Sequence, residues 1–262
     1  MGTSGKKTKT VVLIHGAWMT PISWEGFKTY FEKQGFNVIT PTWPLMDKSI
    51  EELRAHPDDH FGALSFKEIV DHLEKVIRAL PEPPLLVGHS MGGLVVQLLL
   101  DRGVGAAGIC IDPAPIAGVI PDLRSLTSAL PGLLRLAGWR KPYILSKEAF
   151  DKNFANTTPA VQRDVDYKRL VVPAPGKIFF QAATGIGTRV DAKHRKQPLL
   201  FIAGESDRTA APAMVKANYR KQKKSPSRTD LKSFAGVSHY LIAEPGWEKV
   251  ADASVKWAQE VM

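Results

Sequence analysis

Apolar residues along the chain fall into short runs that are separated by longer amphipathic segments. The short runs have the length of strands, and they cover residues 10–14, 36–40, 84–88, 108–112, 198–203 and 229–234. The longer segments have apolar residues at helical spacing, and they cover residues 23–34, 64–80, 91–102, 213–222 and the C-terminal part from about 246. Strands that alternate with helices in this way predict an α/β fold, in which helices cover both faces of a mostly parallel sheet.

The alternation breaks down between residues 113 and 196, where helical fragments are interrupted by prolines and glycines. Strand signals return after this region, so it is typical of an insertion into a single domain. A chain of 262 residues is long enough for one such domain. We therefore predict a core made of residues 1–112 and 197–262, with residues 113–196 inserted between its two parts.

Composition narrows the class of protein. Hydrophobic residues make up 44% of the chain and charged residues 23%, the balance of a soluble globular protein. No apolar run approaches the roughly 18 residues that a membrane-spanning helix needs, and the N-terminal residues lack the apolar stretch of an export signal. The single cysteine, Cys110, can form no intramolecular disulfide. This fits a reducing compartment, and we expect a cytoplasmic location.

The net charge of +9 raises the question of anionic partners. Basic residues concentrate at 189–196 and 216–228, but no aromatic residue interleaves with the lysines of 220–224. A nucleic-acid partner is therefore not expected. Two histidines and two aspartates lie close together at residues 56–60, without helical spacing or a supporting ligand cluster. We interpret this run as a polar loop, and we expect neither a metal nor a cofactor.

The strongest chemical signal is a G-x-S-x-G pattern formed by Gly88, Ser90 and Gly92. It follows a predicted strand and precedes a predicted apolar helix, which is the context in which such a serine is exposed on a sharp turn. The glycines leave room for the turn, and the start of the helix directs backbone N–H groups toward any oxyanion formed there. The pattern predicts that Ser90 is a nucleophile.

A serine nucleophile needs a general base and a carboxylate that orients it, in the chain order Ser, Asp or Glu, His. Asp207 follows the predicted strand 198–203, and His239 follows the strand 229–234. Loops at the carboxyl ends of parallel strands meet at one crevice, so these residues can converge. Glu205 is a competing carboxylate in the same loop. We favour Asp207, because it lies deeper in the loop.

Oxyanion stabilisation should come from backbone N–H groups, one of them in the residue after the nucleophile. Met91 supplies this group, and the loop after the first strand offers Ala17 as the second donor. Trp18, next to this loop, is our candidate for the substrate pocket. His15 and His89 lie beside the same elements, and we interpret both as structural, since His239 fills the position of the base.

Four motifs in this order carry a resemblance to a known family. They are His15-Gly16-Ala17-Trp18, Gly88-His-Ser90-Met-Gly92-Gly93, Gly204-Glu-Ser-Asp207 and Gly236-Val-Ser-His239. Together they resemble the α/β-hydrolase superfamily, and within it the small serine esterases with an HGAW oxyanion loop. The resemblance implies a sheet of about six strands, without the two antiparallel strands that often precede it. It also implies that residues 113–196 form a helical lid over the active site.

The resemblance implies hydrolysis of carboxylic esters through an acyl-Ser90 intermediate. Hydroxynitrile lyases of this fold have a lysine and a threonine where this chain has Tyr240 and Gly16, which favours hydrolysis. The apolar stretch at 116–136 suggests a small-molecule ester with a hydrophobic acyl or alcohol group. A receptor for a small molecule, or a lyase or perhydrolase with the same serine triad, is the alternative. The sequence leaves the natural substrate and the oligomeric state open.

Overall fold

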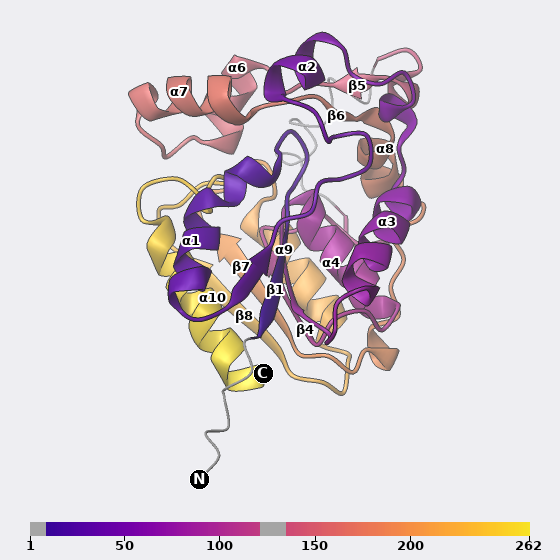
Figure 1. Ribbon diagram of the computed structural model, residues 1–262, viewed down its shortest axis with the longest axis vertical. Coiled ribbons are helices and arrows are strands. Elements are labelled where there is room, and N and C mark those ends of the chain that lie inside the picture. The colour runs from indigo at the N-terminus through magenta and orange to yellow at the C-terminus, as the bar shows by residue number, and fades with distance from the viewer. Residues whose placement is uncertain (1–8, 121–134) are drawn as a thin grey trace.

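The computed structural model describes residues 9–120 and 135–262. Its centre is a six-stranded sheet with the strand order β2-β1-β3-β4-β7-β8 (Figure 1), in which all neighbouring strands are parallel. The strands are β1 (Thr10–Ile14), β2 (Asn37–Ile39), β3 (Leu85–His89), β4 (Ala107–Ile111), β7 (Leu199–Gly204) and β8 (Thr229–Phe234). The predicted α/β class and the predicted number of strands are confirmed.

Helices cover both faces of the sheet because its central strands β1, β3, β4 and β7 are apolar on both sides. Along β1, Val11 and Leu13 belong to one buried cluster, while Val12 and Ile14 belong to the other. The first cluster is covered by α1 (Glu25–Lys33) and α10 (Trp247–Val261), and the second by α3 (Phe66–Arg78), α4 (Met91–Asp101) and α9 (Pro212–Gln222). A parallel sheet that is buried on both faces explains the continuous apolar runs in the sequence.

The segment between β2 and α3 contains two elements that periodicity did not predict. They are the helix α2 (Ile50–Ala55) and the 3-10 turn η2 (Phe61–Ala63). Ser49 caps α2 by accepting from the Glu52 N–H, and the Glu52 side chain accepts from the Ser49 N–H in return. This capping box is a recognisable start signal. The helix has six residues, too few for a periodic pattern to stand out.

Most of the elements between β4 and β7 lie above the carboxyl ends of the strands, and the last of them lies near the end of α4, where the Asp191 N–H donates to Asp101 at 2.7 Å (Figure 1). These elements are η3 (Gly138–Arg140), β5 (Pro142–Tyr143), α6 (Lys147–Ala149), the π-helical turn η4 (Phe150–Phe154), α7 (Ala160–Leu170), β6 (Ala174–Pro175), α8 (Gly176–Thr184) and η5 (Ala192–His194). Strands β5 and β6 form a small antiparallel pair. The apolar stretch predicted at 116–136 falls largely outside the described residues.

Residues 50–63 pack onto this inserted region although they are remote from it in sequence. The Arg54 side chain donates to the Val171 carbonyl at 2.7 Å and to the Tyr167 carbonyl at 2.9 Å. A Cβ atom added at Gly62 would lie 2.5 Å from the carbonyl oxygen of Arg140, so the two backbones are in close contact. We call residues 50–63 and 138–184 together the cap layer.

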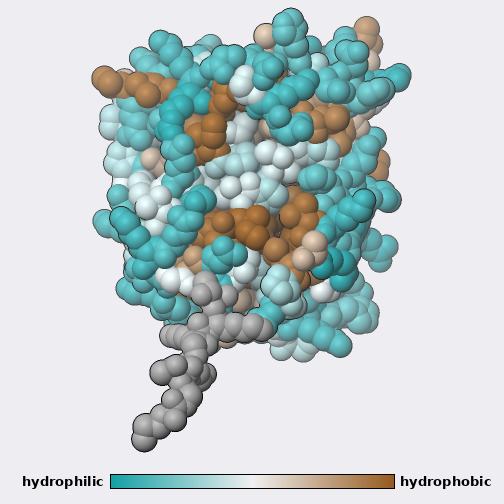
Figure 2. Space-filling view, in the orientation of Figure 1, coloured by the Kyte–Doolittle hydropathy of each residue, from teal (hydrophilic) through white to brown (hydrophobic). Residues whose placement is uncertain are grey.

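The surface of the cap layer carries exposed apolar residues. Figure 2 shows hydrophobic side chains in separate patches, one of them at the end of α7. Val161 and Val165 on this helix are 79% and 56% exposed, and Trp139 and Ile144 are also exposed. Among the described residues, no helix is both long enough and apolar enough to cross a membrane.

Candidate active site

Ser90 lies on the sharp turn between β3 and α4, with φ 57° and ψ −121°. This backbone conformation strongly favours glycine, so a serine in it is strained. The neighbouring glycines are needed for the close packing of the turn. A Cβ atom at Gly88 would overlap the Gly92 carbonyl oxygen, and one at Gly92 would lie 2.5 Å from the carbonyl oxygen of His15. The turn holds the Ser90 hydroxyl at the end of the sheet.

The structure brings the three predicted side chains into one chain of hydrogen bonds. The oxygen Oγ of Ser90 lies 2.9 Å from Nε2 of His239, and Nδ1 of His239 lies 2.6 Å from Oδ2 of Asp207. Ser90 follows β3, His239 follows β8 and Asp207 follows β7. Because Nδ1–H donates to the carboxylate, the lone pair of Nε2 faces the hydroxyl and can accept its proton.

Asp207 accepts hydrogen bonds from several donors. In addition to the imidazole, the backbone N–H groups of Thr209 and Ala210 donate to Oδ1 at 2.6 and 2.9 Å. The competing carboxylate, Glu205, lies on the surface, where it forms an ion pair with Lys216 at 3.3 Å. Of the two carboxylates in this loop, the structure therefore places Asp207 against the imidazole.

The loop that carries His239 is fixed from two sides. Buried Glu244 accepts from the Ser238 backbone N–H at 2.7 Å and from the Ser238 hydroxyl at 2.8 Å. His89 donates from Nε2 to the carbonyl oxygen of His239 at 2.8 Å. Burial lowers the pKa of His89 well below its ordinary value, so this ring is neutral. These contacts agree with the structural role predicted for His89.

The loop after β1 lies directly against the turn at Ser90. A Cβ atom at Gly16 would be 2.8 Å from Cβ of Ser90, which brings the backbone of Ala17 next to the serine. Met91 is the first residue of α4, where N–H groups point out of the helix. Both positions suit the oxyanion donors predicted from the sequence, whose role stays a prediction.

His15 supports this loop from within the core. Its ring stacks on Trp43 at a centroid distance of 4.6 Å, and Nδ1 donates to the Gly16 carbonyl at 2.9 Å. Burial lowers the pKa of His15 to about 4. A neutral, stacked imidazole fits the structural role that we predicted.

Trp18 connects the same loop to the cap layer. Its side chain is 3% exposed, its Nε1–H donates to the Tyr143 carbonyl at 3.0 Å, and its ring stacks on Phe179 at 5.0 Å. Phe154 of η4 also contacts it and lies edge-on to His239 at 4.8 Å. These are packing contacts, and a role of Trp18 in substrate binding stays a prediction.

Asp112 is a buried carboxyl group next to the site that sequence reasoning missed. It follows β4. One of its carboxyl oxygens lies within 4.8 Å of a carboxylate oxygen of Asp207 and of a ring nitrogen of His239. A metal bound by these three groups would compete with the hydrogen bond from His239 to Asp207. The expectation that the site holds no metal thus stays a prediction. The available signal was a carboxylate at the last position of the predicted strand 108–112.

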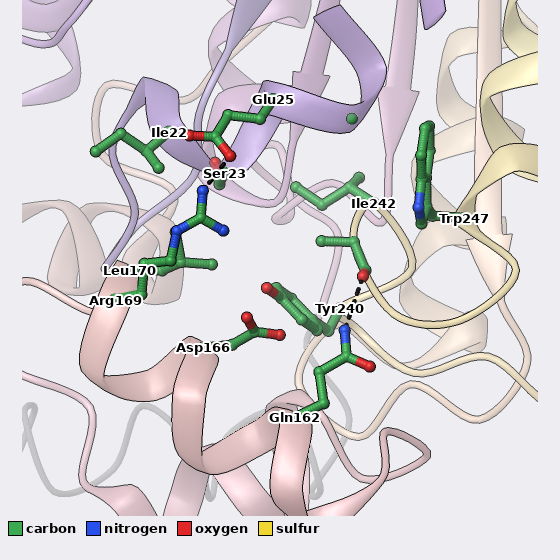
Figure 3. Close-up of a pocket in the computed structure, with 12 residues that line it drawn as sticks. Ile22, Ser23, Glu25, Gln162, Asp166, Arg169, Leu170, Tyr240, Ile242 and Trp247 are labelled. Carbon is green, nitrogen blue, oxygen red and sulfur yellow. Dashed lines mark hydrogen bonds and ion pairs between the residues drawn. The ribbon is translucent and has the colours of Figure 1, made fainter. Parts of the chain in front are cut away.

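A pocket of about 170 Å³, partly open to solvent, lies beside this site (Figure 3). It is formed by η1 (Pro21–Trp24), the start of α1, α7 and residues 240–247. Arg169 forms an ion pair with Glu25 on one side of it, and Asp166 points toward Tyr240 on another. Neither Ser90 nor His239 lines this pocket, and most of its exposed lining is polar. It gives no support to a hydrophobic acyl site.

Comparison with known proteins places the chain in a family. Residues 11–253 match the model described as the alpha/beta hydrolase family. The chain belongs to this family. Among solved structures it is similar to a monoacylglycerol lipase of Paleococcus ferrophilus, with 21% identity and a TM-score of 0.70 over 95% of both chains. The similarity to solved structures shows the fold.

Two plant proteins are similar to the same extent. Tomato methylketone synthase I has 17% identity and a TM-score of 0.71 over 97% of this chain and 99% of its own. The Arabidopsis methylesterase MES16 has 16% identity and a TM-score of 0.70 over 96% and 99%. No curated protein sequence matches the chain. The chain is thus an α/β hydrolase whose structural neighbours include esterases and a lipase.

Proposed function

We propose that this protein is a serine hydrolase that cleaves carboxylic esters through an acyl-enzyme intermediate. The observation that carries the proposal is the continuous hydrogen-bonded chain from Ser90 through His239 to Asp207. Structural neighbours named as a monoacylglycerol lipase and a methylesterase agree with an ester substrate.

The geometry supports a two-step reaction. Oγ of Ser90 attacks the ester carbonyl while Nε2 of His239 takes its proton, and Asp207 stabilises the imidazolium. The negative charge on the carbonyl oxygen is met by the N–H groups of Ala17 and Met91. The intermediate collapses when the C–O bond to the alcohol breaks, and His239 returns the proton to this leaving group. Water, activated by the same imidazole, then releases the acid and regenerates Ser90.

We propose that residues 113–196 act as a lid over this site. The contact between Phe154 and His239 brings this region directly to the proposed base. Its exposed apolar residues, such as Trp139 and Ile144, support a substrate with a hydrophobic acyl or alcohol group. A cytoplasmic location stays a prediction from the sequence.

Hydrolysis of a chain-length series of p-nitrophenyl esters tests the proposal. The wild type should turn over, and Ser90→Ala should lower kcat by about five orders of magnitude. Ser254→Ala is the matched control, because Ser254 is a buried serine of α10 that donates to the Val250 carbonyl, remote from the proposed triad. Equal turnover by wild type and Ser90→Ala would contradict the proposal. Binding of the esters without turnover would favour the receptor instead.

A further inference from the structure

Two carboxyl groups are buried side by side at the ends of neighbouring strands. Asp112 follows β4 and Asp207 follows β7, and these strands are paired in the sheet. The side chain of Asp112 is fully buried, and one of its carboxyl oxygens lies within 4.8 Å of a carboxyl oxygen of Asp207. Two carboxylates this close in a buried site cannot both be ionised without a large cost in free energy. One of them must hold a proton.

The hydrogen-bond donors around the pair decide which group holds it. Asp207 accepts three hydrogen bonds, from the imidazole of His239 and from the N–H groups of Thr209 and Ala210. Asp112 accepts one, at Oδ1, from the N–H of Gly204 at 2.9 Å. Donors stabilise the ionised form of a carboxyl group. The negative charge therefore belongs on Asp207.

The second oxygen of Asp112 is the place for the proton. Oδ2 is buried and accepts no hydrogen bond from any donor among the described residues, and Asp112 lies within hydrogen-bonding range of the Asp207 side chain. A buried oxygen that no donor reaches is costly unless it carries a hydrogen to donate to a nearby acceptor. The charged groups that act on Asp112 are Asp207 and, more weakly, Glu244, and both are acidic. Burial and these negative charges raise the pKa of Asp112 well above its ordinary value.

We propose that Asp112 is a positioning residue for the hydrolytic site, an un-ionised carboxylic acid that donates a hydrogen bond from Oδ2 to the carboxylate of Asp207. This inference rests on the proposed function, because it assigns Asp207 the task of orienting His239. The donated hydrogen bond fixes Asp207 and reduces its basicity. Without it, Asp207 would stabilise the imidazolium of His239 more strongly, and His239 would become a working base only at higher pH.

Two substitutions at Asp112 separate a hydrogen-bond donor from a charged group. In Asp112→Asn, the amide oxygen can accept from Gly204 and the amide NH₂ can donate to Asp207, as the protonated acid does. Asp112→Leu has a similar size and no donor. Asp166→Asn is the control, since Asp166 is another buried aspartate that lies on α7, away from Asp207.

The pH profile of kcat/KM for p-nitrophenyl ester hydrolysis is the first measurement. Asp112→Asn and Asp166→Asn should keep the acidic limb of the profile and stay within about threefold of the wild type. Asp112→Leu should lower kcat/KM by about tenfold and move the acidic limb up by about one pH unit. A merely structural role would lower the yield of active enzyme without moving this limb. An unmoved limb in Asp112→Leu, or a loss in Asp112→Asn as large as in Asp207→Asn, would overturn the proposal.

Infrared spectroscopy tests the proton itself and needs neither turnover nor the leucine variant. Protein labelled with ¹³C-aspartate should show the carbonyl stretch of an un-ionised carboxylic acid at neutral pH. The band should disappear in Asp112→Asn and persist in Asp166→Asn. A wild type without this band overturns the proposal even if the enzyme hydrolyses esters. A band in an enzyme that does not hydrolyse esters supports the proton on Asp112 and rejects the proposed function alone.

Discussion

Replacing Ser90 with glycine should stabilise the fold while it removes the proposed nucleophile. The backbone at Ser90 has φ 57° and ψ −121°, a conformation that glycine adopts freely and other residues adopt only under strain. Backbone hydrogen bonds hold this conformation, since the Ser90 N–H donates to Ile111 at 2.9 Å and its carbonyl accepts from Gly93 and Ala114 at 2.9 and 3.0 Å. These bonds do not involve the side chain and will persist in the variants.

The expected magnitude follows from a comparison of two variants that both lack the hydroxyl. Ser90→Ala keeps the Cβ atom and its strain, whereas Ser90→Gly loses both. At a position with positive φ, the penalty for alanine exceeds the entropy that glycine gains in the unfolded chain, and the net difference is about 1 kcal/mol in favour of glycine. For a chain of this length, this corresponds to a Tm that is roughly 2–4 °C higher.

Urea and thermal unfolding, followed by circular dichroism, measure this difference. The matched pair Ser254→Gly and Ser254→Ala lies within the helix α10, where alanine should be the more stable variant by about 1 kcal/mol. The opposite sign at the two positions is the diagnostic result. If Ser90→Ala proves as stable as Ser90→Gly, the strain that we attribute to the turn does not exist.

Three further variants test the packing, the charge and the protonation around the site. In Gly92→Ala the added Cβ atom would lie 2.5 Å from the carbonyl oxygen of His15, so α4 must move. Ester turnover should then fall at least about 100-fold. Near-normal turnover would show that the turn tolerates the added atom. Asp207→Asn should lower kcat by about four orders of magnitude, while Glu205→Gln on the surface should change it by less than about twofold, and similar losses in both would contradict the assignment. The pKa of His15 is lowered from 6.5 to about 4, so the unfolded chain binds more protons between these pH values and stability falls as the pH drops through this window. His15→Phe should reduce this loss of unfolding free energy by up to about 3 kcal/mol, measured by urea unfolding at a series of pH values. His60→Gln, at an exposed histidine, is the control. If His15→Phe loses as much stability as the wild type between these pH values, His15 is not held neutral.

The strands and the three site residues could be predicted because their signals are local. A parallel sheet buried on both faces leaves continuous apolar runs, such as residues 10–14, in which Thr10–Ile14 was predicted with the bounds that the structure has. Ser90 stands directly after β3, while Asp207 and His239 stand in the loops that follow β7 and β8, and each lies close to glycines of its turn. Parallel strands place their carboxyl ends together, so a local position after a strand becomes a spatial one.

The features that were missed depend on tertiary neighbours. Asp112 gains its meaning from the pairing of β4 with β7, and strand order is not written in any local pattern. Trp18 was a candidate from the sequence, but its contacts with Tyr143 and Phe179, more than 100 residues away, could not be predicted for the same reason. Helix α2 did carry a local signal in its capping box at Ser49, and periodicity alone was too weak to find it.

The central claim is that Ser90 is an activated nucleophile, and covalent labelling by a fluorophosphonate tests it most directly. The native protein should gain one phosphonyl group, and mass spectrometry of its peptides should place this group on Ser90. His239→Gln should lower the rate of labelling by at least about a thousandfold, because the base is lost. Rapid labelling of Ser90 that depends on His239 is the result that we predict. A native protein that is not labelled, or that is labelled at another residue, would contradict the account.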